Sequence, residues 1–197
     1  MKLVLATHNK DKITEIKALL QVLPINILTF QEFVRFPDVV EDMDTLEGNA
    51  EKKAREIFKI TGMPALADDT GLFVDAINGE PGVFSSRYAG ENVTYADNRE
   101  KLLREMADIP DGKRDAAFKT VIVLIMSKDE KYIVEGRCEG YIGVEEKGTK
   151  GFGYDSIFYL HDTGKSFAEL AVEEKNKISH RGRALQKIKK ILEKITK

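Results

Sequence analysis

The sequence predicts a mixed α/β fold, and three patterns indicate it. The chain opens with an apolar run, Lys2–Ala6, and then Lys10–Leu23, in which apolar residues recur at helical spacing. Two β-rich runs, Ala117–Ser127 and Tyr132–Gly140, are joined by a short polar stretch that is typical of a hairpin. The last stretch, Arg183–Ile195, again has helical spacing. We therefore expect a mixed β-sheet flanked by helices.

The remaining elements follow from local patterns. Thr45 is a plausible N-cap for the second helix. Ser179 is placed to cap the last helix, which puts His180 and Arg181 in its first turn. A short apolar run before Asp68 predicts a strand that ends at that residue. The other predicted elements are a strand at Ile25–Thr29, helices at Thr45–Thr61 and Thr94–Met106, a short strand at Ile157–Leu160, and loops at Asp38–Asp44 and Gly148–Tyr154.

Length and composition restrict the class of protein. The chain has 197 residues, 42% of them hydrophobic and 32% charged, which predicts one folded domain over residues 1–197, with room for two lobes. A net charge of −2 argues against a general nucleic-acid binder. The apolar N-terminal run is too short for a signal sequence or a membrane span, so we expect no membrane association. The one cysteine, Cys138, suits a reducing compartment, and we expect a cytoplasmic protein.

Asp68 and Asp69 are the most informative pair in the chain. They follow the apolar run Met63–Ala67 directly and precede Thr70 and Gly71. Open α/β sheets usually bind ligands where a strand ends, and two adjacent carboxylates need a cation, a proton or hydrogen bonds to compensate their repulsion. A metal or acid–base role is the functional interpretation. The alternative is an ordinary turn, since Asp and Gly are common turn residues.

A polar loop, Thr7–Lys12, leaves the first strand and enters the first helix. Its backbone N–H groups and the positive end of the helix dipole favour an anion. Thr7 and Asn9 offer neutral hydrogen bonds, and Lys12 offers an ammonium group to a phosphate. The alternative makes Asn9 an N-cap and Lys12 a solvated residue. The loop lacks the glycines of a P-loop.

Three other segments are candidates for the same site. Glu41 lies in an acidic loop before the second helix and offers oxygen ligands suited to Mg²⁺, although such runs are usually solvated. In Gly151–Asp155, aromatic residues alternate with glycines, which suits the stacking of a ring on a flat ligand. The alternative is a β-bulge or turn whose aromatic side chains belong to the core. His180 and Arg181 are cations at a helix N-terminus, where they oppose the helix dipole. One interpretation is that they bind a ligand, and the other is that they are an ordinary pair of surface residues.

Five motifs together resemble the inosine triphosphate pyrophosphatase family along almost the whole chain. The first two are Thr7, Asn9 and Lys12, and Ala67–Leu72. The others are Pro81–Gly90, Gly151–Asp155 and Glu174–Gly182. Each motif alone is weak evidence for the family, whereas all five motifs in the same order are strong evidence.

The chain departs from this family at two places. Many members have Glu-Asn-Ala at the start of the second helix, where this chain has Gly48-Asn49-Ala50 and Glu47 one position earlier. We therefore place the second metal carboxylate at Glu41 and not on that helix. Ser156 replaces a common proline, which should affect loop stiffness more than chemistry.

The resemblance implies an elongated mixed sheet, two lobes around a nucleotide cleft, a homodimer, and Mg²⁺-dependent hydrolysis of ITP, dITP and XTP to the monophosphate and pyrophosphate, which cleanses the nucleotide pool. Asp69 and Lys12 would be catalytic, and Glu41 and Asp69 would bind the metal, with Asp68 as a further possible ligand. Donors on the base side would suit a 6-oxo purine and repel adenine. The residues implied to bind substrate are Thr7, His8, Asn9, Lys10, Asp11, Lys12, Thr70, Phe152, Gly153, Tyr154, Asp155, Lys175, His180 and Arg181.

Two other functions stay open. One is a nucleotide pyrophosphatase with another base preference, because the phosphate and metal residues are less base-specific than the pocket. The other is a nucleotide-binding regulator without turnover. The complete acid set argues against the regulator, since a polyanion binder gains little from uncompensated carboxylates.

Overall fold

A computed structural model describes residues 1–196; the predicted domain ends at Lys197, which lies outside the described residues. The strands form one mixed sheet in the order β2-β1-β3-β5-β6-β7, with β4 paired to β3. The predicted mixed α/β fold is confirmed. The elements are β1 (Lys2–Leu5), α1 (Lys10–Leu20), β2 (Asn26–Leu28), α2 (Leu46–Thr61), β3 (Ala65–Val74), β4 (Pro81–Gly82), α3 (Tyr95–Glu105), β5 (Asp115–Ile125), β6 (Lys131–Ile142), β7 (Phe158–Tyr159), α4 (Val172–Ile178) and α5 (His180–Ile195).

The chain divides into two compact units, and β3, β5 and β6 contribute to both. The first unit contains residues 1–69 and 120–136 and the chain from His180 onward; the second contains residues 70–119 and 137–179. The predicted hairpin therefore supplies its tip to the first unit. Each unit has its own hydrophobic core.

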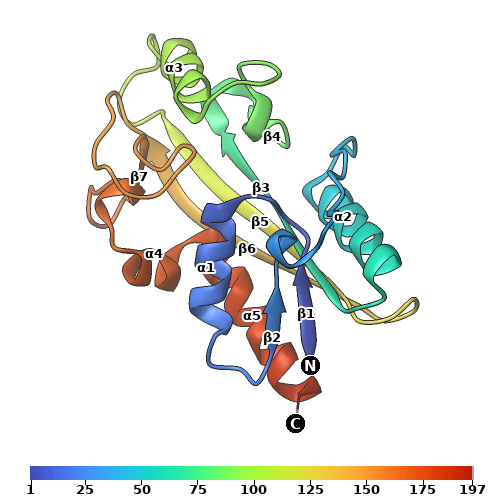
Figure 1. Ribbon diagram of the computed structural model, residues 1–197. Coiled ribbons are helices and arrows are strands. Elements are labelled where there is room, and N and C mark those ends of the chain that lie inside the picture. The colour runs from blue at the N-terminus through green and yellow to red at the C-terminus, as the bar shows by residue number, and fades with distance from the viewer. Residues whose placement is uncertain (197) are drawn as a thin grey trace. The chain divides into compact units, whose positions relative to one another are not determined.

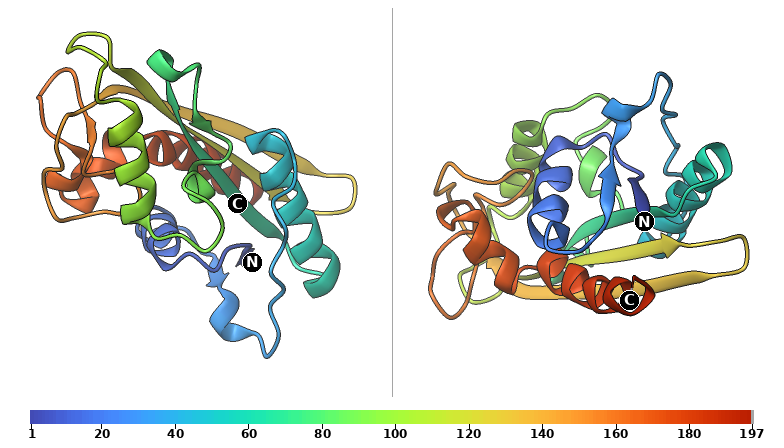
Figure 2. Two further views of the ribbon diagram at one scale, coloured as in Figure 1. Left: turned by 90° about the horizontal axis from the view of Figure 1, so that it is seen from above. Right: turned by 60° about the horizontal axis from the view of Figure 1, so that its bottom comes forward.

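In the first unit, β1 pairs in parallel with β2, and the two strands lie side by side (Figure 1). The apolar face of α1, with Ile13, Ile16 and Leu20, packs into the same core as Leu185 and Leu192 of α5. The helix α5 runs along the β5–β6 hairpin (Figure 2). Gly136 on β6 permits this approach, because a Cβ there would overlap the backbone at His180 and Ala184.

In the second unit, aromatic residues form the centre of the core. The Phe118 and Phe158 rings lie 4.7 Å apart, and Phe158 and Phe167 lie 4.8 Å apart. The strands β6 and β7 pair antiparallel, with Tyr141 opposite Tyr159. These contacts fix the ends of the loop that contains Gly151–Asp155.

Two predictions about elements need correction. The strand that was expected to end at Asp68 continues as β3 to Val74. Gly71 does not form a turn; it lies against β4, where a Cβ would overlap the carbonyl oxygen of Gly82. The sequence patterns also did not predict α4, a short helix that ends at Ile178, so that only Ser179 separates it from α5.

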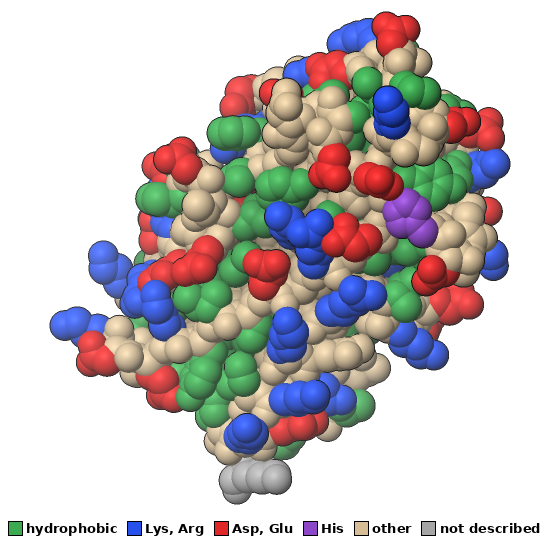
Figure 3. Space-filling view, turned by 180° about the vertical axis from the view of Figure 1, so that it is seen from behind, with side chains coloured by type: hydrophobic (Ala, Val, Ile, Leu, Met, Phe, Trp, Pro, Cys, Tyr) green, Lys and Arg blue, Asp and Glu red, His purple; other side chains and the backbone are tan. Residues whose placement is uncertain are grey.

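Charged side chains of both signs are interspersed on the face shown in Figure 3, as the near-neutral net charge implies. Within residues 1–196, no helix combines the length and apolar character needed to cross a bilayer.

Candidate active site

Asp68 and Asp69 lie in the middle of β3 and have different partners. Successive side chains on a strand point to opposite faces, so the two carboxylates meet different elements. The Lys12 Nζ lies 3.2 Å from Asp68 Oδ2, and the Arg181 Nε donates to the same oxygen at 3.1 Å. Asp69 accepts from the Asn49 Nδ2 at 3.1 Å. The two neighbouring acids are therefore chemically distinct.

The pKa values of the two acids are shifted in opposite directions. Burial alone would raise the pKa of Asp68, but the charges of Lys12 and Arg181 outweigh it and lower the pKa well below its usual range. Burial raises the pKa of Asp69, against the charges of Lys53 and Lys12. Asp68 is thus held ionised, whereas Asp69 is the acid that more readily accepts a proton.

Arg181 is fixed by two carboxylates. Its side chain is 2% exposed, and its Nη1 donates to the Glu15 Oε2 at 2.5 Å while its Nε donates to Asp68. Glu15 is buried on α1, three residues after Lys12. The cation that opposes the dipole of α5 is therefore stabilised by ion pairs from two other elements. Its expected contact with a base stays a prediction.

Lys53 on α2 lies between the two predicted metal ligands. Its ammonium pairs with Glu41 and lies 3.6 Å from the Asp69 Oδ1, and it also donates to the Asp68 carbonyl oxygen at 2.8 Å. Burial alone would lower the pKa of Lys53, but Asp69 and Glu41 raise it. The ammonium of Lys53 thus supplies a positive charge to both the Glu41 and the Asp69 carboxylates.

The donor set fits a hard divalent cation. Among residues 1–196, no three His, Cys, Asp or Glu side chains are grouped closely enough to hold a metal by themselves. Mg²⁺ commonly uses one or two carboxylates and takes its other ligands from water and phosphate oxygens. Glu41 and Asp69, gathered around one ammonium group, meet that requirement.

The helix α2 contributes more to the site than expected. The departure from the family pattern at Gly48–Asn49 put a metal-ligand role for this helix in doubt. Asn49 and Lys53 nevertheless both contact Asp69. The Asn49 Oδ1 also accepts from the Met43 N–H at 3.0 Å, which fixes the end of the acidic loop. The sequence contained a signal for this role, because Asn49 and Lys53 are polar residues on the buried face of the helix.

The loop before α1 has the geometry of a capped helix start. The Asn9 Oδ1 accepts from the backbone N–H groups of Asp11 and Lys12 at 2.9 and 3.1 Å, and the Thr7 Oγ1 accepts from the Asn9 N–H at 3.1 Å. Asn9 is therefore the N-cap, as the alternative interpretation proposed. Lys12 is not a solvated residue, because its ammonium pairs with Asp68 and burial lowers its pKa. Lys10 and Asp11 are exposed.

Most of the predicted base-recognition residues lie in the second unit. The Lys175 ammonium on α4 contacts the Asp155 Oδ2 at 2.7 Å and lies 5.0 Å from the centre of the Phe152 ring. The Phe152 N–H donates to the same Asp155 oxygen at 2.8 Å. The Tyr154 hydroxyl donates to the Ser85 carbonyl oxygen at 2.8 Å, so this group supports the loop from inside. Gly153 adopts a positive φ of 62° next to these residues.

The remaining predicted residues are divided between the units. Thr70 is half-buried on β3 and belongs to the second unit. His180 is buried at the first position of α5 in the first unit. His8 contacts the segment before α2 through its side chain. The structure thus brings together Lys12, Glu41, Asp68, Asp69 and Arg181 in the first unit.

A cavity of about 450 Å³ in the second unit includes none of the predicted site residues. Arg114 lines it, together with Tyr141, Tyr159 and His161. The Arg114 guanidinium donates to four carbonyl oxygens, those of Met106, Ile109, Ile142 and Gly143. These bonds indicate a structural role for the arginine.

Residues 3–191 match the model of the Ham1 family. The chain belongs to that family. It is 48% identical over 188 residues to a dITP/XTP pyrophosphatase of Geobacter sulfurreducens, covering 95% of this chain and 94% of the relative. A dITP/XTP pyrophosphatase of Leuconostoc mesenteroides is 47% identical over 195 residues, which cover 98% and 96% of the two chains.

Solved structures agree with this assignment. A HAM1 protein from Coxiella burnetii superposes with a TM-score of 0.90 at 43% identity, covering 98% of this chain and 99% of that one. A nucleoside-triphosphatase / dITP/XTP pyrophosphatase from Mycobacterium abscessus gives a TM-score of 0.77 at 40% identity, covering 95% and 98%.

Proposed function

We propose that this chain hydrolyses non-standard purine nucleoside triphosphates, ITP, dITP and XTP, to the monophosphate and pyrophosphate. Such a reaction would remove these nucleotides before they enter DNA or RNA. Membership of the Ham1 family and the names of the similar enzymes support the proposal. The observation that carries it is the buried pair Asp68 and Asp69, in which Asp68 contacts the cations of Lys12 and Arg181 and Asp69 contacts Asn49 and Lys53.

Asp69 is the proposed general base. It orients a water molecule and accepts its proton, while the water oxygen bonds to the α-phosphorus and the bond to the bridging oxygen breaks to release pyrophosphate. The Asn49 amide holds the Asp69 carboxylate in place. Asp68 supports this geometry by fixing Lys12 and Arg181.

The loop Thr7–Lys12 is proposed to bind the phosphates. Backbone N–H groups at the start of α1 and the Lys12 ammonium supply donors and positive charge. The pairing of Lys12 with Asp68 keeps that ammonium directed toward the acid pair. Phosphoryl transfer requires mainly positioning and charge neutralisation, which these groups provide.

Glu41 and Asp69 are the proposed ligands of Mg²⁺. When bound, the metal would neutralise phosphate charge and orient the phosphate oxygens. The ammonium of Lys53 lies beside both carboxylates and supplies a positive charge that a bound metal would replace.

Lys175, with Phe152, Gly153, Tyr154 and Asp155, is proposed to recognise the base. The ammonium of Lys175 would donate to the 6-oxo group of hypoxanthine or xanthine, whereas adenine presents an amino donor there. The Phe152 ring offers a stacking surface. His180 and Arg181 are proposed to contribute further donors.

Assembly and location complete the proposal. We expect a homodimer, and the exposed side chains of Phe84 and Tyr95 in the second unit are compatible with a contact surface. The chain has one cysteine, Cys138, which is buried, and a single cysteine suits the reducing cytoplasm.

A panel of ITP, dITP, XTP, GTP and ATP incubated with Mg²⁺ tests the function, with pyrophosphate and orthophosphate measured separately. We expect pyrophosphate from the first three nucleotides. Release of orthophosphate instead of pyrophosphate would show that a different phosphate bond is cleaved. Hydrolysis of GTP or ATP in place of the first three nucleotides would favour a nucleotide pyrophosphatase with another base preference. Binding of ITP without any product would favour a regulator.

A further inference from the structure

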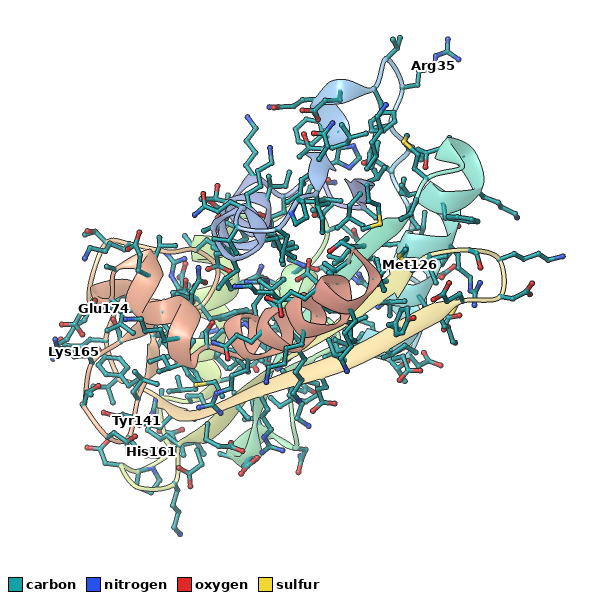
Figure 4. All side chains as sticks on the ribbon, turned by 90° about the horizontal axis from the view of Figure 1, so that it is seen from below. Arg35, Met126, Tyr141, His161, Lys165 and Glu174 are labelled. Carbon is teal, nitrogen blue, oxygen red and sulfur yellow. The ribbon has the colours of Figure 1, made fainter. Side chains whose placement is uncertain are left out.

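The segment that carries Glu41 has no helix or strand between Phe33 and Asp44. Its ends are anchored. The Glu32 carboxylate accepts from the Thr29 N–H at 2.6 Å, and the Lys52 Nζ lies 2.7 Å from the Asp42 carboxylate. Near its start the segment extends into solvent, where Val34 is fully exposed and Arg35 points outward (Figure 4). Glu41 thus depends on a long irregular segment for its position.

His8 contacts the middle of this segment. Its Nδ1 lies 3.0 Å from the Asp38 Oδ1, and its ring centre lies 5.2 Å from those of both Phe30 and Phe36. Phe36 in turn contacts Phe33 at 5.5 Å. The side chain of His8 therefore joins the segment to the loop that is proposed to bind phosphates.

We propose that His8 is a positioning residue that holds the segment Phe33–Val40 and thereby keeps Glu41 beside Lys53 and Asp69. The proposal rests on the proposed function of this site. The backbone of His8 belongs to the phosphate loop, whereas its side chain is directed to Asp38 and two phenylalanines. His8 therefore differs from the residues whose side chains are proposed to contact the substrate.

The physical basis is the conformational freedom of the segment. Each residue without regular structure costs free energy to order, so a contact near the middle favours the binding-competent position of Glu41. The polar contact with Asp38 is exposed and contributes little, while the aromatic contacts contribute more. Loss of His8 should therefore weaken the metal site.

Amide hydrogen exchange of the protein without metal or nucleotide tests the first part. We expect His8→Ala to increase exchange over residues 33–42 by about threefold or more, and His8→Phe, which keeps the ring, to restore most of the protection. Arg35→Ala, an exposed change in the same segment, is the matched control and should leave exchange near the wild-type value. Unchanged exchange in His8→Ala would overturn the proposal.

Kinetics with ITP test the second part. The Mg²⁺ concentration for half-maximal rate should rise about threefold or more in His8→Ala, and His8→Phe should restore most of the wild-type value. A raised KM for ITP at saturating Mg²⁺, with an unchanged Mg²⁺ requirement, would instead show direct substrate binding and overturn the proposal. If the wild-type protein has no activity, the proposed function fails, and the exchange experiment still decides the role of His8.

Discussion

Arg181 and Asp68 are 113 residues apart in the sequence and are joined by a hydrogen bond of 3.1 Å in the interior of the first unit. Glu15 binds the same guanidinium from α1. This pairing explains why Arg181 lies in the first turn of α5 against the helix dipole, and it holds one acid of the pair ionised beside the other.

Asp68→Asn should destabilise the protein strongly, because it leaves Lys12 and Arg181 with less negative charge in a buried place. Breaking a buried pair typically costs about 3–5 kcal/mol. The free energy of unfolding from a denaturant titration at neutral pH measures the loss. A change below about 1 kcal/mol would show that the ion pairs matter little.

The stability advantage of the wild type over Asp68→Asn should depend on pH. Because the pKa of Asp68 is lowered by folding, its contribution is complete above its unfolded value of about 4 and is lost as the pH falls toward its folded value. Thermal unfolding at pH 7, 5, 4 and 3 should therefore show a difference that narrows below about pH 4. A difference that grows in acid would contradict the assignment.

Glu15→Gln should lower the melting temperature, because the guanidinium of Arg181 loses one of its two carboxylate partners. Hydrogen bonds to charged groups contribute about 1.5–3 kcal/mol. Glu193→Gln on the exposed face of α5 removes the same charge elsewhere and serves as control. Equal melting temperatures of the two variants would argue against the buried pair.

Lys53→Met should increase the stabilisation that Mg²⁺ confers. Without the ammonium group, Glu41 and Asp69 lose a shared cation, which a bound metal would replace. The rise in melting temperature on adding Mg²⁺ should exceed that of the wild type. A smaller rise would mean that Lys53 helps to build the metal site and does not stand in for the cation.

Lys175→Met should reduce discrimination between ITP and ATP. The variant removes a donor that suits a 6-oxo group and repels a 6-amino group, and each such contact changes the ratio of kcat/KM values by about tenfold or more. The ratio for ITP over ATP measures the effect, with Lys177→Met on the exposed side of α4 as control. An unchanged ratio would remove Lys175 from base recognition.

Local patterns in the sequence were sufficient for most elements. Thr45 caps α2 and Thr94 caps α3, and the apolar spacing of α1 matches its buried face. The continuation of β3 through Asp68 and Asp69 was not predictable, because it depends on cations from α1, α2 and α5. Nearby cations favour the charged form of buried acids, so the strand can continue through two adjacent carboxylates.

The same limit applies to the site. Motifs located Asp68, Asp69 and Lys12, but Glu15, Asn49 and Lys53 were missed because their partners are distant in sequence. The signal was present in Glu15, an acid beside Ile13 and Ile16 on a helix that packs against the core. A charged residue at such a position requires a buried partner, and only the folded chain shows which one.

The central claim is that Asp69 activates water at a site that binds a nucleoside triphosphate. The most direct measurement compares pyrophosphate release from ITP by the wild type and by Asp69→Asn, with ITP binding measured for both proteins. We expect the variant to lose at least about 100-fold in rate while its binding of ITP stays measurable. A near-normal rate in Asp69→Asn would contradict the account.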